Sequence, residues 1–194
     1  MSKLIIADNL EMLTGQGATR RRLLQAGLGA CTLFVMPAVN AAYSPRIYEK
    51  RVSLLNMHTG ERIRTAYWEK GRYIPGALKE IAKVLRDHRS GERHPIDPRL
   101  LDLIQHLQGK IGSSREFQVV SAYRSPATNA ALSARSHGVA KHSLHMQGKA
   151  IDIRLPGVPL HTLRRAAMSM HAGGVGYYPE SNFIHVDTGN VRYW

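Results

Sequence analysis

Cysteine and acidic side chains are scarce in this sequence of 194 residues. The single cysteine, Cys31, cannot form an internal disulfide, and it excludes the cysteine-rich classes of zinc site. Only 14 acidic residues accompany 27 basic ones, so the formal net charge is +13, which favours an anionic partner without identifying it. Hydrophobic residues make up 43% of the chain and charged residues 21%, which is typical of a globular protein and excludes a disordered one.

The sequence also lacks internal repeats, low-complexity linkers and any apolar run of the roughly 20 residues that a comfortable transmembrane helix needs. A chain of 194 residues is long enough for one domain with its own hydrophobic core, or at most for two small domains.

Residues 1–42 have the composition of a secretory targeting segment. A basic stretch at 19–25 (TRRRLLQ) precedes a short apolar stretch at 26–36, and the small residues after Pro37 resemble a cleavage site. Paired arginines before a weakly hydrophobic, glycine-containing stretch indicate the twin-arginine export route. We therefore predict that residues 1–42 are a twin-arginine signal peptide that is removed, that 43–194 form the mature domain, and that the protein works in the periplasm.

Two alternative interpretations would keep the protein at the membrane. The signal would act as an anchor if it stayed uncleaved, although its apolar stretch is short for a transmembrane helix. Residues 28–31 (LGAC) also resemble a lipoprotein box in which Cys31 would carry the lipid, but the apolar run continues past Cys31 and favours simple cleavage. Membrane contact is thus expected only if Cys31 is lipidated or the signal is uncleaved. Because exported proteins rarely work on nucleic acid, we expect no nucleic-acid partner.

The segment from residue 43 mixes strand and helix patterns without strict alternation. Strand composition predicts strands over 52–57, 62–68, 117–123, 150–155, 174–178 and 183–187. Apolar residues at helical spacing and helix-start signals predict helices over 75–89, from 98 to the glycines at 109 and 112, over 127–136 and over 159–171. This order favours an α+β domain with a small, mainly antiparallel sheet and flanking helices.

Two histidines and an aspartate in the C-terminal part of the chain have the spacing of metal ligands. His145 and Asp152 flank Gly148, which permits a sharp turn, and Asp152 lies on the polar face of its predicted strand. In the last predicted strand, His185 and Asp187 share one face. Two histidines and one carboxylate, with a fourth position left for water, form the ligand set of a catalytic zinc site. The spacing alone is weak evidence, since a histidine on a strand is more often an ordinary surface residue.

The motifs around these residues resemble a known family. Residues 143–152 (SLHMQGKAID) and 183–189 (FIHVDTG) resemble the signature of the zinc proteins grouped as lysostaphin-like, D-Ala-D-Ala-peptidase-like and hedgehog-like. The similarity is closest to the YcbK-like (MepK-like) murein endopeptidases, and 121–126 (SAYRSP), 173–178 (GGVGYY) and 192–194 (RYW) agree with it. The resemblance covers nearly all of the predicted mature chain.

This resemblance implies a hedgehog/D-Ala-D-Ala-peptidase-like fold and one zinc ion per chain, bound by His145, Asp152 and His185. It also implies a substrate-binding role for Arg124, whose guanidinium has the fork geometry that pairs with a peptide carboxylate. Ser143 would take part in substrate binding by shaping its loop or by bonding a ligand. The alternatives are a surface ion pair for Arg124 and a simple turn hydroxyl for Ser143.

The general base is the point at which this sequence departs from the family pattern. Many relatives carry Glu, Asp or His two or three positions before the last zinc ligand, where this chain has Phe183 and Asn182. Asp187 is our first candidate for a catalytic residue, either as the base or as a partner of the last ligand, with a turn cap as the alternative. His142 is the second candidate, because penicillin-insensitive murein endopeptidases have a comparable His-x-x-His near the metal. The alternative is that His142 is an ordinary solvent-exposed histidine in a loop.

The activity that the resemblance implies is metal-assisted hydrolysis of peptide cross-links in peptidoglycan. The expected target is the bond between two diaminopimelate residues, with the D-Ala–diaminopimelate bond as a further one. The alternatives are a D-Ala-D-Ala carboxypeptidase and a non-catalytic, zinc-containing wall-binding module. The wall-binding module stays open because residues 182 and 183 depart from the family pattern for the base. The expected partner is the peptidoglycan sacculus, whose free carboxylates suit a basic protein.

Overall fold

The structure is a computed structural model that describes residues 48–135 and 140–194. The predictions for residues 1–42, including those for Cys31, lie outside these described residues. In the part of the chain that is described, no helix combines the length and the apolar character needed to cross a membrane.

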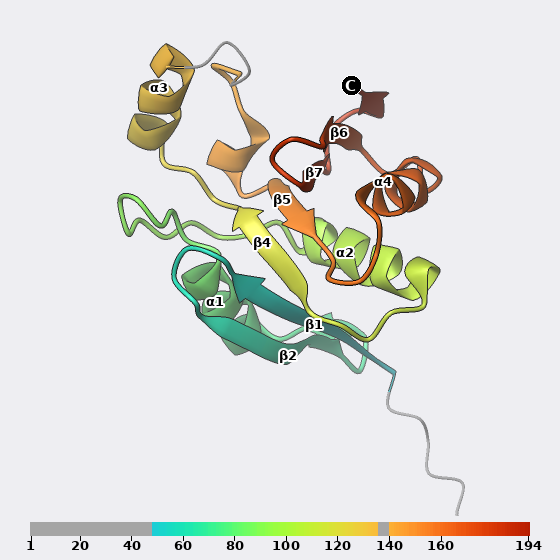
Figure 1. Ribbon diagram of the computed structural model, residues 1–194. Helices are drawn as coiled ribbons and strands as arrows, with labels where there is room; N and C mark the ends of the chain where they lie inside the picture. Colours follow the sequence, from blue (N-terminus) through green and yellow to red (C-terminus); the bar gives the residue numbers. More distant parts are fainter. Residues whose placement is uncertain (1–47, 136–139) are drawn as a thin grey trace, which may run out of the picture. The chain divides into compact units, whose positions relative to one another are not determined.

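One eight-stranded sheet organises the described residues, in the order β3-β2-β1-β4-β5-β7-β6-β8. Figure 1 labels all of these strands except the two short edge strands, β3 and β8. Its strands are β1 (Glu49–Asn56), β2 (Arg62–Glu69), β3 (Arg72–Tyr73), β4 (Phe117–Ser121), β5 (Ala150–Arg154), β6 (Gly174–Tyr178), β7 (Phe183–Asp187) and β8 (Arg192–Tyr193). The pairs β1–β4 and β6–β8 are parallel, and the other neighbours are antiparallel.

The predicted α+β class is confirmed, but the sheet is larger than predicted and mixed, because two of its seven strand pairs are parallel. β1 and β4 can pair in parallel because a long connection, which contains two strands and two helices, separates them. The sequence does not predict the edge strands β3 and β8, because two residues are too few to give an alternating pattern.

Within residues 48–135 and 140–194, four α-helices accompany the sheet, and all four occur where the sequence predicts a helix. They are α1 (Pro75–Val84), α2 (Pro98–Ile111), α3 (Pro126–Arg135) and α4 (Leu160–Met168), and a short 3₁₀ helix, η1 (Leu144–Gln147), lies between α3 and β5. Helix α2 begins as expected, because the side chain of Asp97 accepts a hydrogen bond from the Arg99 N–H and Pro98 occupies the first turn.

Helix α1 ends at Val84, five residues before the predicted end at 89. The cause is the carboxylate of Asp87, which accepts hydrogen bonds from the backbone N–H groups of Arg89 (2.9 Å) and Ser90 (3.5 Å). An aspartate that bonds the backbone two and three residues further on forms a turn that competes with the helix.

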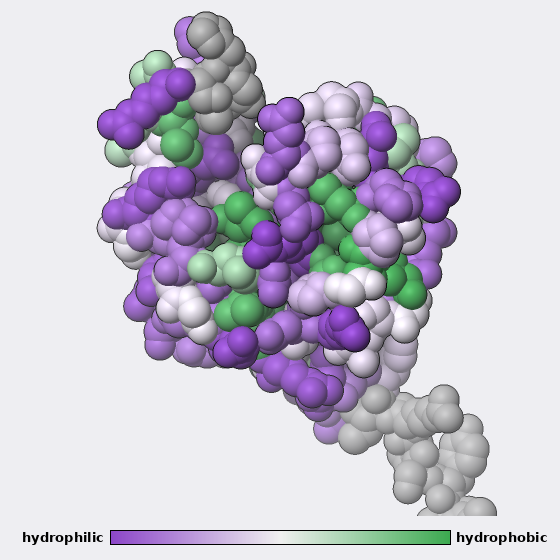
Figure 2. Space-filling model, viewed as in Figure 1, coloured by the Kyte–Doolittle hydropathy of each residue, from purple (hydrophilic) through white to green (hydrophobic). Residues whose placement is uncertain are grey.

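The hydrophobic core lies between the helices and the sheet. Helix α1 packs against β2, α2 against β1, and α4 against β6 and β7, while α2 also contacts α4. Completely buried apolar side chains come from all these elements and include Leu54, Ile81, Leu100, Leu107, Phe117, Ile151, Ile153, Leu163 and Ile184. Figure 2 shows that polar side chains predominate on the visible face, with apolar ones exposed between them.

The alternation of β5 and β7 separates the core from the opposite face of the sheet. Ile151 and Ile153 of β5, like Ile184 of β7, belong to the core cluster. Asp152 and His185 alternate with these residues and therefore point to the other face. The same pleat that fills the core thus places two polar side chains together, away from it.

Candidate metal centre

Three segments that are far apart in the sequence bring the predicted metal ligands together. Asp152 of β5 and His185 of β7 are directly paired in the antiparallel register, so their side chains are neighbours on one face. His145 comes from η1, where the Ser143 hydroxyl accepts a hydrogen bond from the His145 N–H at 3.3 Å. Gly148 ends this short helix with a φ of 63°, the left-handed conformation that glycine adopts without strain.

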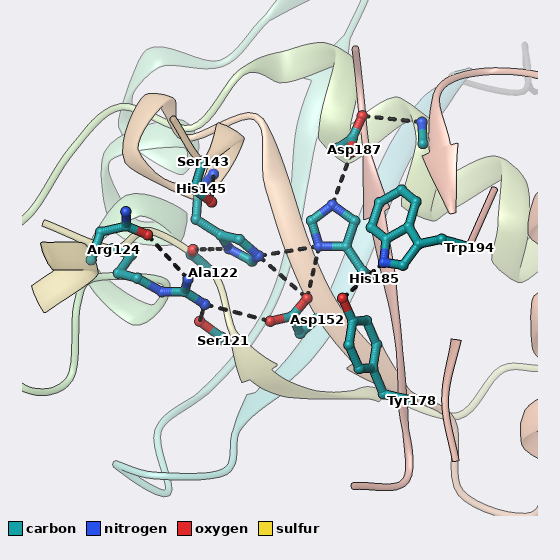
Figure 3. A network of polar contacts seen from close by, with 12 residues as sticks. Ser121, Ala122, Arg124, Ser143, His145, Asp152, Tyr178, His185, Asp187 and Trp194 are labelled. Carbon is teal, nitrogen blue, oxygen red and sulfur yellow. Dashed lines mark hydrogen bonds and ion pairs between the residues drawn. The ribbon is translucent and has the colours of Figure 1, made fainter. Parts of the chain in front are cut away.

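The three side chains present one atom each at mutual distances that suit a metal ion (Figure 3). His145 Nε2 lies 3.2 Å from His185 Nδ1 and 3.3 Å from Asp152 Oδ1, and His185 Nδ1 lies 2.9 Å from Asp152 Oδ1. Ligand atoms about 2.0 to 2.1 Å from a tetrahedral zinc ion are about 3.3 Å apart. The three atoms therefore form nearly one face of such a tetrahedron.

Hydrogen bonds behind the two imidazoles fix which ring nitrogen faces the cluster. His145 Nδ1 lies 2.6 Å from the Ala122 carbonyl oxygen, which can only accept, so Nδ1 donates and Nε2 keeps its lone pair. His185 Nε2 lies 2.9 Å from Asp187 Oδ2 and donates to it, so Nδ1 keeps its lone pair. Two lone pairs and a carboxylate oxygen that converge in a buried site repel one another unless a cation lies among them, and the donor set therefore fits a metal ion.

Burial and neighbouring charges act in opposite directions on the pKa values of Asp152 and His185. Burial by itself would raise the pKa of Asp152, but the adjacent imidazoles outweigh it and hold the pKa below its usual value. Burial by itself would lower the pKa of His185, but the adjacent carboxylates of Asp152 and Asp187 outweigh it and raise the pKa. The carboxylate thus stays ionised and available as a ligand.

Asp187 lies behind His185 and is completely buried. Besides the imidazole, its two oxygens accept hydrogen bonds from the backbone N–H groups of Gly174 (3.0 Å) and Gly189 (2.8 Å), and from both terminal nitrogens of Arg192 (2.7 and 3.1 Å). Burial would raise the pKa of Asp187, but these donors outweigh it and keep the pKa well below its usual range. Because this carboxylate already accepts five hydrogen bonds, it is better suited to orienting His185 than to taking up a proton as a base.

Comparison with known proteins identifies the family. The family model described as peptidoglycan L,D-endopeptidase MepK matches residues 43–194. This chain belongs to the MepK family. The membership expected from the motifs is therefore confirmed, and the peptidase group that contains this family is metal-dependent.

Two relatives show how close the similarity is. Over 180 residues the chain is 44% identical to the peptidoglycan L,D-endopeptidase MepK of Escherichia coli strain K12, with 91% of this chain and 97% of the relative aligned. Over 180 residues it is 41% identical to the probable peptidoglycan L,D-endopeptidase MepK of Haemophilus influenzae, with 90% of this chain and 95% of the relative aligned.

A cleft of about 330 Å³ opens in front of the candidate ligands of this MepK family member, and it is lined by Arg124, His142 and Ser143 in addition to His145, Asp152 and His185. The Arg124 side chain is 12% exposed, and its Nη2 lies 3.8 Å from Asp152 Oδ2. His142 is exposed at the cleft, whereas Ser143 is buried and holds the backbone of η1. The structure thus brings all the predicted site residues together: six of them line the cleft, and Asp187 lies behind His185, outside the cleft.

The motif analysis did not assign a role to the aromatic side of this cleft. Tyr178, Phe183 and Trp194 line it opposite the loop that carries Ser143, and the Trp194 ring lies 5.3 Å from the His185 ring. The motifs at 173–178 and 192–194 contain two of these residues. Their sequence positions do not reveal that the C-terminus folds back onto β6, because this pairing depends on long-range contacts.

Proposed function

We propose that this protein is a zinc-dependent peptidoglycan L,D-endopeptidase that hydrolyses peptide cross-links, mainly those between two diaminopimelate residues, with D-Ala–diaminopimelate bonds as a further target. The observation that carries the proposal is the buried triangle of His145, Asp152 and His185, in a chain whose relatives are named for this activity. Two imidazoles and one carboxylate with an open fourth position are the ligands of a catalytic zinc ion rather than of a structural one.

The proposed roles start from the metal ligands. His145, Asp152 and His185 would hold one zinc ion, which supplies Lewis-acid chemistry by polarising the scissile carbonyl and acidifying an attacking water. Asp187 would keep His185 in its metal-binding orientation, since partners of this kind fix the ring and raise its basicity.

Arg124 is proposed to bind a carboxylate of the substrate. Its two hydrogen bonds within the described residues, to Asn129 Oδ1 (3.3 Å) and Ser121 Oγ (3.4 Å), are long, and donors of the guanidinium remain available. Diaminopimelate carries a carboxylate beside the cross-linked amine, and a guanidinium fork pairs well with such a group. Ser143 would support this side of the cleft by fixing the loop that carries His145.

His142 is proposed to move a proton during the reaction. It is the cleft-lining imidazole that does not belong to the ligand triangle, and it is exposed, so a water or a leaving amine can reach it. Proton transfer by such a group contributes about 10²- to 10⁴-fold to the rate. A His142→Gln variant would therefore lose kcat while retaining bound zinc.

The periplasm is the proposed location, because the sacculus lies there. The family model aligns to residues 43–194, which is the segment that would remain after removal of the proposed twin-arginine signal peptide at 1–42. The excess of basic residues suits the free carboxylates of peptidoglycan stem peptides, and we propose the sacculus as the partner.

Substitution of the three ligands tests the proposal. His145→Ala, Asp152→Ala and His185→Ala are expected to lose bound zinc and digestion of purified sacculi together, while His106→Ala, an exposed histidine of α2, loses neither. A ligand variant that keeps both zinc and activity would remove that residue from the site. Release of terminal D-Ala alone would instead indicate a carboxypeptidase, and sacculus binding without turnover would indicate a wall-binding module.

A further inference from the structure

Tyr178 and Trp194 form a hydrogen-bonded pair on the wall of the cleft (Figure 3). Tyr178 is the last residue of β6, and Trp194 is the last residue of the chain. The indole Nε1 of Trp194 lies 2.8 Å from the Tyr178 hydroxyl oxygen. Both side chains line the same cleft as His145, Asp152 and His185.

The direction of this hydrogen bond leaves the tyrosine proton free. An indole N–H can only donate, so the Tyr178 oxygen is the acceptor. Among the described residues, the Tyr178 hydroxyl donates to no acceptor of its own. Its proton is therefore available to an acceptor that enters the cleft, and Figure 3 shows the hydroxyl end of Tyr178 on the side of the ring that is nearer to Asp152 and His185.

The pair is held in place before any substrate binds. The Tyr178 ring stacks on Phe183 with 4.7 Å between ring centroids. The backbone of Trp194 is tied to β6, since the Tyr177 N–H donates to the Trp194 carbonyl (3.0 Å) and the Trp194 N–H donates to the Val175 carbonyl (3.3 Å).

The Trp194 indole also lies directly on Gly176, where a Cβ atom would come within 2.7 Å of the ring. Gly176 is the register partner of His185. A side chain at position 176 would displace the indole, so the glycine is what permits Trp194 to lie beside the metal ligand and reach Tyr178.

We propose that Tyr178 is a further catalytic residue, whose hydroxyl donates a hydrogen bond to the carbonyl oxygen of the scissile amide as negative charge develops on it, and that Trp194 is the positioning residue that orients this donor. The inference rests on the proposed function, because it concerns the same cleft and the same reaction. Donors that are already aimed at the developing oxyanion are the most effective, since they need no reorganisation during the reaction.

In the reaction, a bond forms between the oxygen of water and the carbonyl carbon, and the bond between this carbon and the amide nitrogen breaks. Both protons of the water end on the leaving amine, which yields a carboxylate and an ammonium group. Tyr178 keeps its own proton throughout. Its contribution is greatest while the carbonyl oxygen carries negative charge and fades when the carbonyl re-forms.

The test is Tyr178→Phe in the zinc-loaded protein, which removes the hydroxyl and keeps the ring that stacks on Phe183. Loss of one oxyanion donor lowers kcat by about 10²- to 10³-fold. KM and the zinc content are expected to stay unchanged. The affinity for a phosphinate analogue of the cross-link, which mimics the tetrahedral state, is expected to fall by about the same factor as kcat.

Tyr177→Phe is the matched control, because this neighbouring ring packs under Arg164 and does not line the cleft. Trp194→Phe tests the positioning role: it is expected to lower kcat on its own but to have no further effect in the Tyr178→Phe background, since it acts through the hydroxyl that is already absent.

A Tyr178→Phe protein with kcat and phosphinate affinity within about threefold of the wild type would overturn the inference, as would full additivity of the two substitutions. If the zinc-loaded wild-type protein fails to cleave cross-linked muropeptides at all, the proposed function fails first. The two failures are therefore distinguishable.

Discussion

Replacing Asp187 by Asn removes the charge behind the His185 imidazole and leaves the shape of the side chain almost unchanged. Asp187 Oδ2 accepts from His185 Nε2 (2.9 Å) and Arg192 Nη2 (2.7 Å), and Oδ1 accepts from Gly174, Gly189 and Arg192 Nη1. An asparagine has one oxygen and one NH₂ group, so whichever way it lies, its NH₂ group faces at least two other donors.

Two consequences follow for Asp187→Asn. The zinc affinity is expected to fall about 10- to 100-fold, as for other partners of metal-bound histidines, which corresponds to about 1.4 to 2.8 kcal/mol. The metal-free protein is expected to lose about 1 to 3 kcal/mol in its free energy of unfolding, because buried donors lose their acceptor while the half-exposed Arg192 stays partly solvated. Competition with a zinc chelator measures the first quantity, and urea unfolding measures the second.

Asp102→Asn provides the matched control, because the Asp102 carboxylate of α2 also accepts several hydrogen bonds, from Lys50, Tyr67 and Tyr73, but lies outside the cleft. It is expected to lower stability and leave zinc affinity unchanged. Unchanged zinc affinity in Asp187→Asn would refute the reasoning. At saturating zinc, kcat within about tenfold of the wild type would support the orienting role of Asp187, whereas a loss of about 10⁴-fold would make it the base.

Three further predictions concern other parts of the molecule. Burial holds the pKa of His88 at about 4, and the facing His58 lowers the pKa further. In the unfolded chain His88 binds a proton near pH 6.5, whereas in the folded protein it does so only near pH 4. The free energy of unfolding therefore falls as the pH is lowered from 6.5 to 4. His88→Asn should therefore flatten the dependence of the urea midpoint on pH in this window, and identical slopes would contradict the prediction. Gly148→Ala should cost at least about 2 kcal/mol in urea unfolding, because φ is +63° and a Cβ atom would overlap the Pro95 carbonyl oxygen; a change below about 0.5 kcal/mol would show that this loop yields easily. Arg124→Lys keeps the charge but loses the fork, so KM for cross-linked peptides should rise about tenfold at unchanged zinc content, and an unchanged KM would remove Arg124 from substrate binding.

The sequence predicts those parts of the fold that depend on neighbouring residues. The Asp97–Pro98 pair marks the start of α2 because the cap and the fixed proline φ act locally. The alternation of polar and apolar residues in β5 and β7 predicts that Asp152 and His185 point to the face of the sheet opposite the core. The sequence pattern does not predict that α1 ends early, because the end depends on which backbone N–H groups donate to the Asp87 carboxylate.

Long-range pairing accounts for what the sequence leaves open in the site. The motif predicts that His145, Asp152 and His185 act together. Their positions in space depend on the β5–β7 register and on the turn at η1. The position of Asp187 behind the site, rather than in the cleft, depends on Arg192, which reaches it from the C-terminal segment. Spacing in the sequence contains no information on such a contact.

The most direct test of the account is cleavage of defined muropeptide dimers by the purified protein after removal of metal and after addition of zinc. One dimer is linked between two diaminopimelate residues and the other between D-Ala and diaminopimelate, and chromatography with mass spectrometry follows their conversion to monomers. We predict that the zinc-loaded protein converts the first dimer faster, that a chelator abolishes conversion, and that zinc restores it. Conversion that persists without metal, or no conversion of either dimer with zinc bound, would contradict the account.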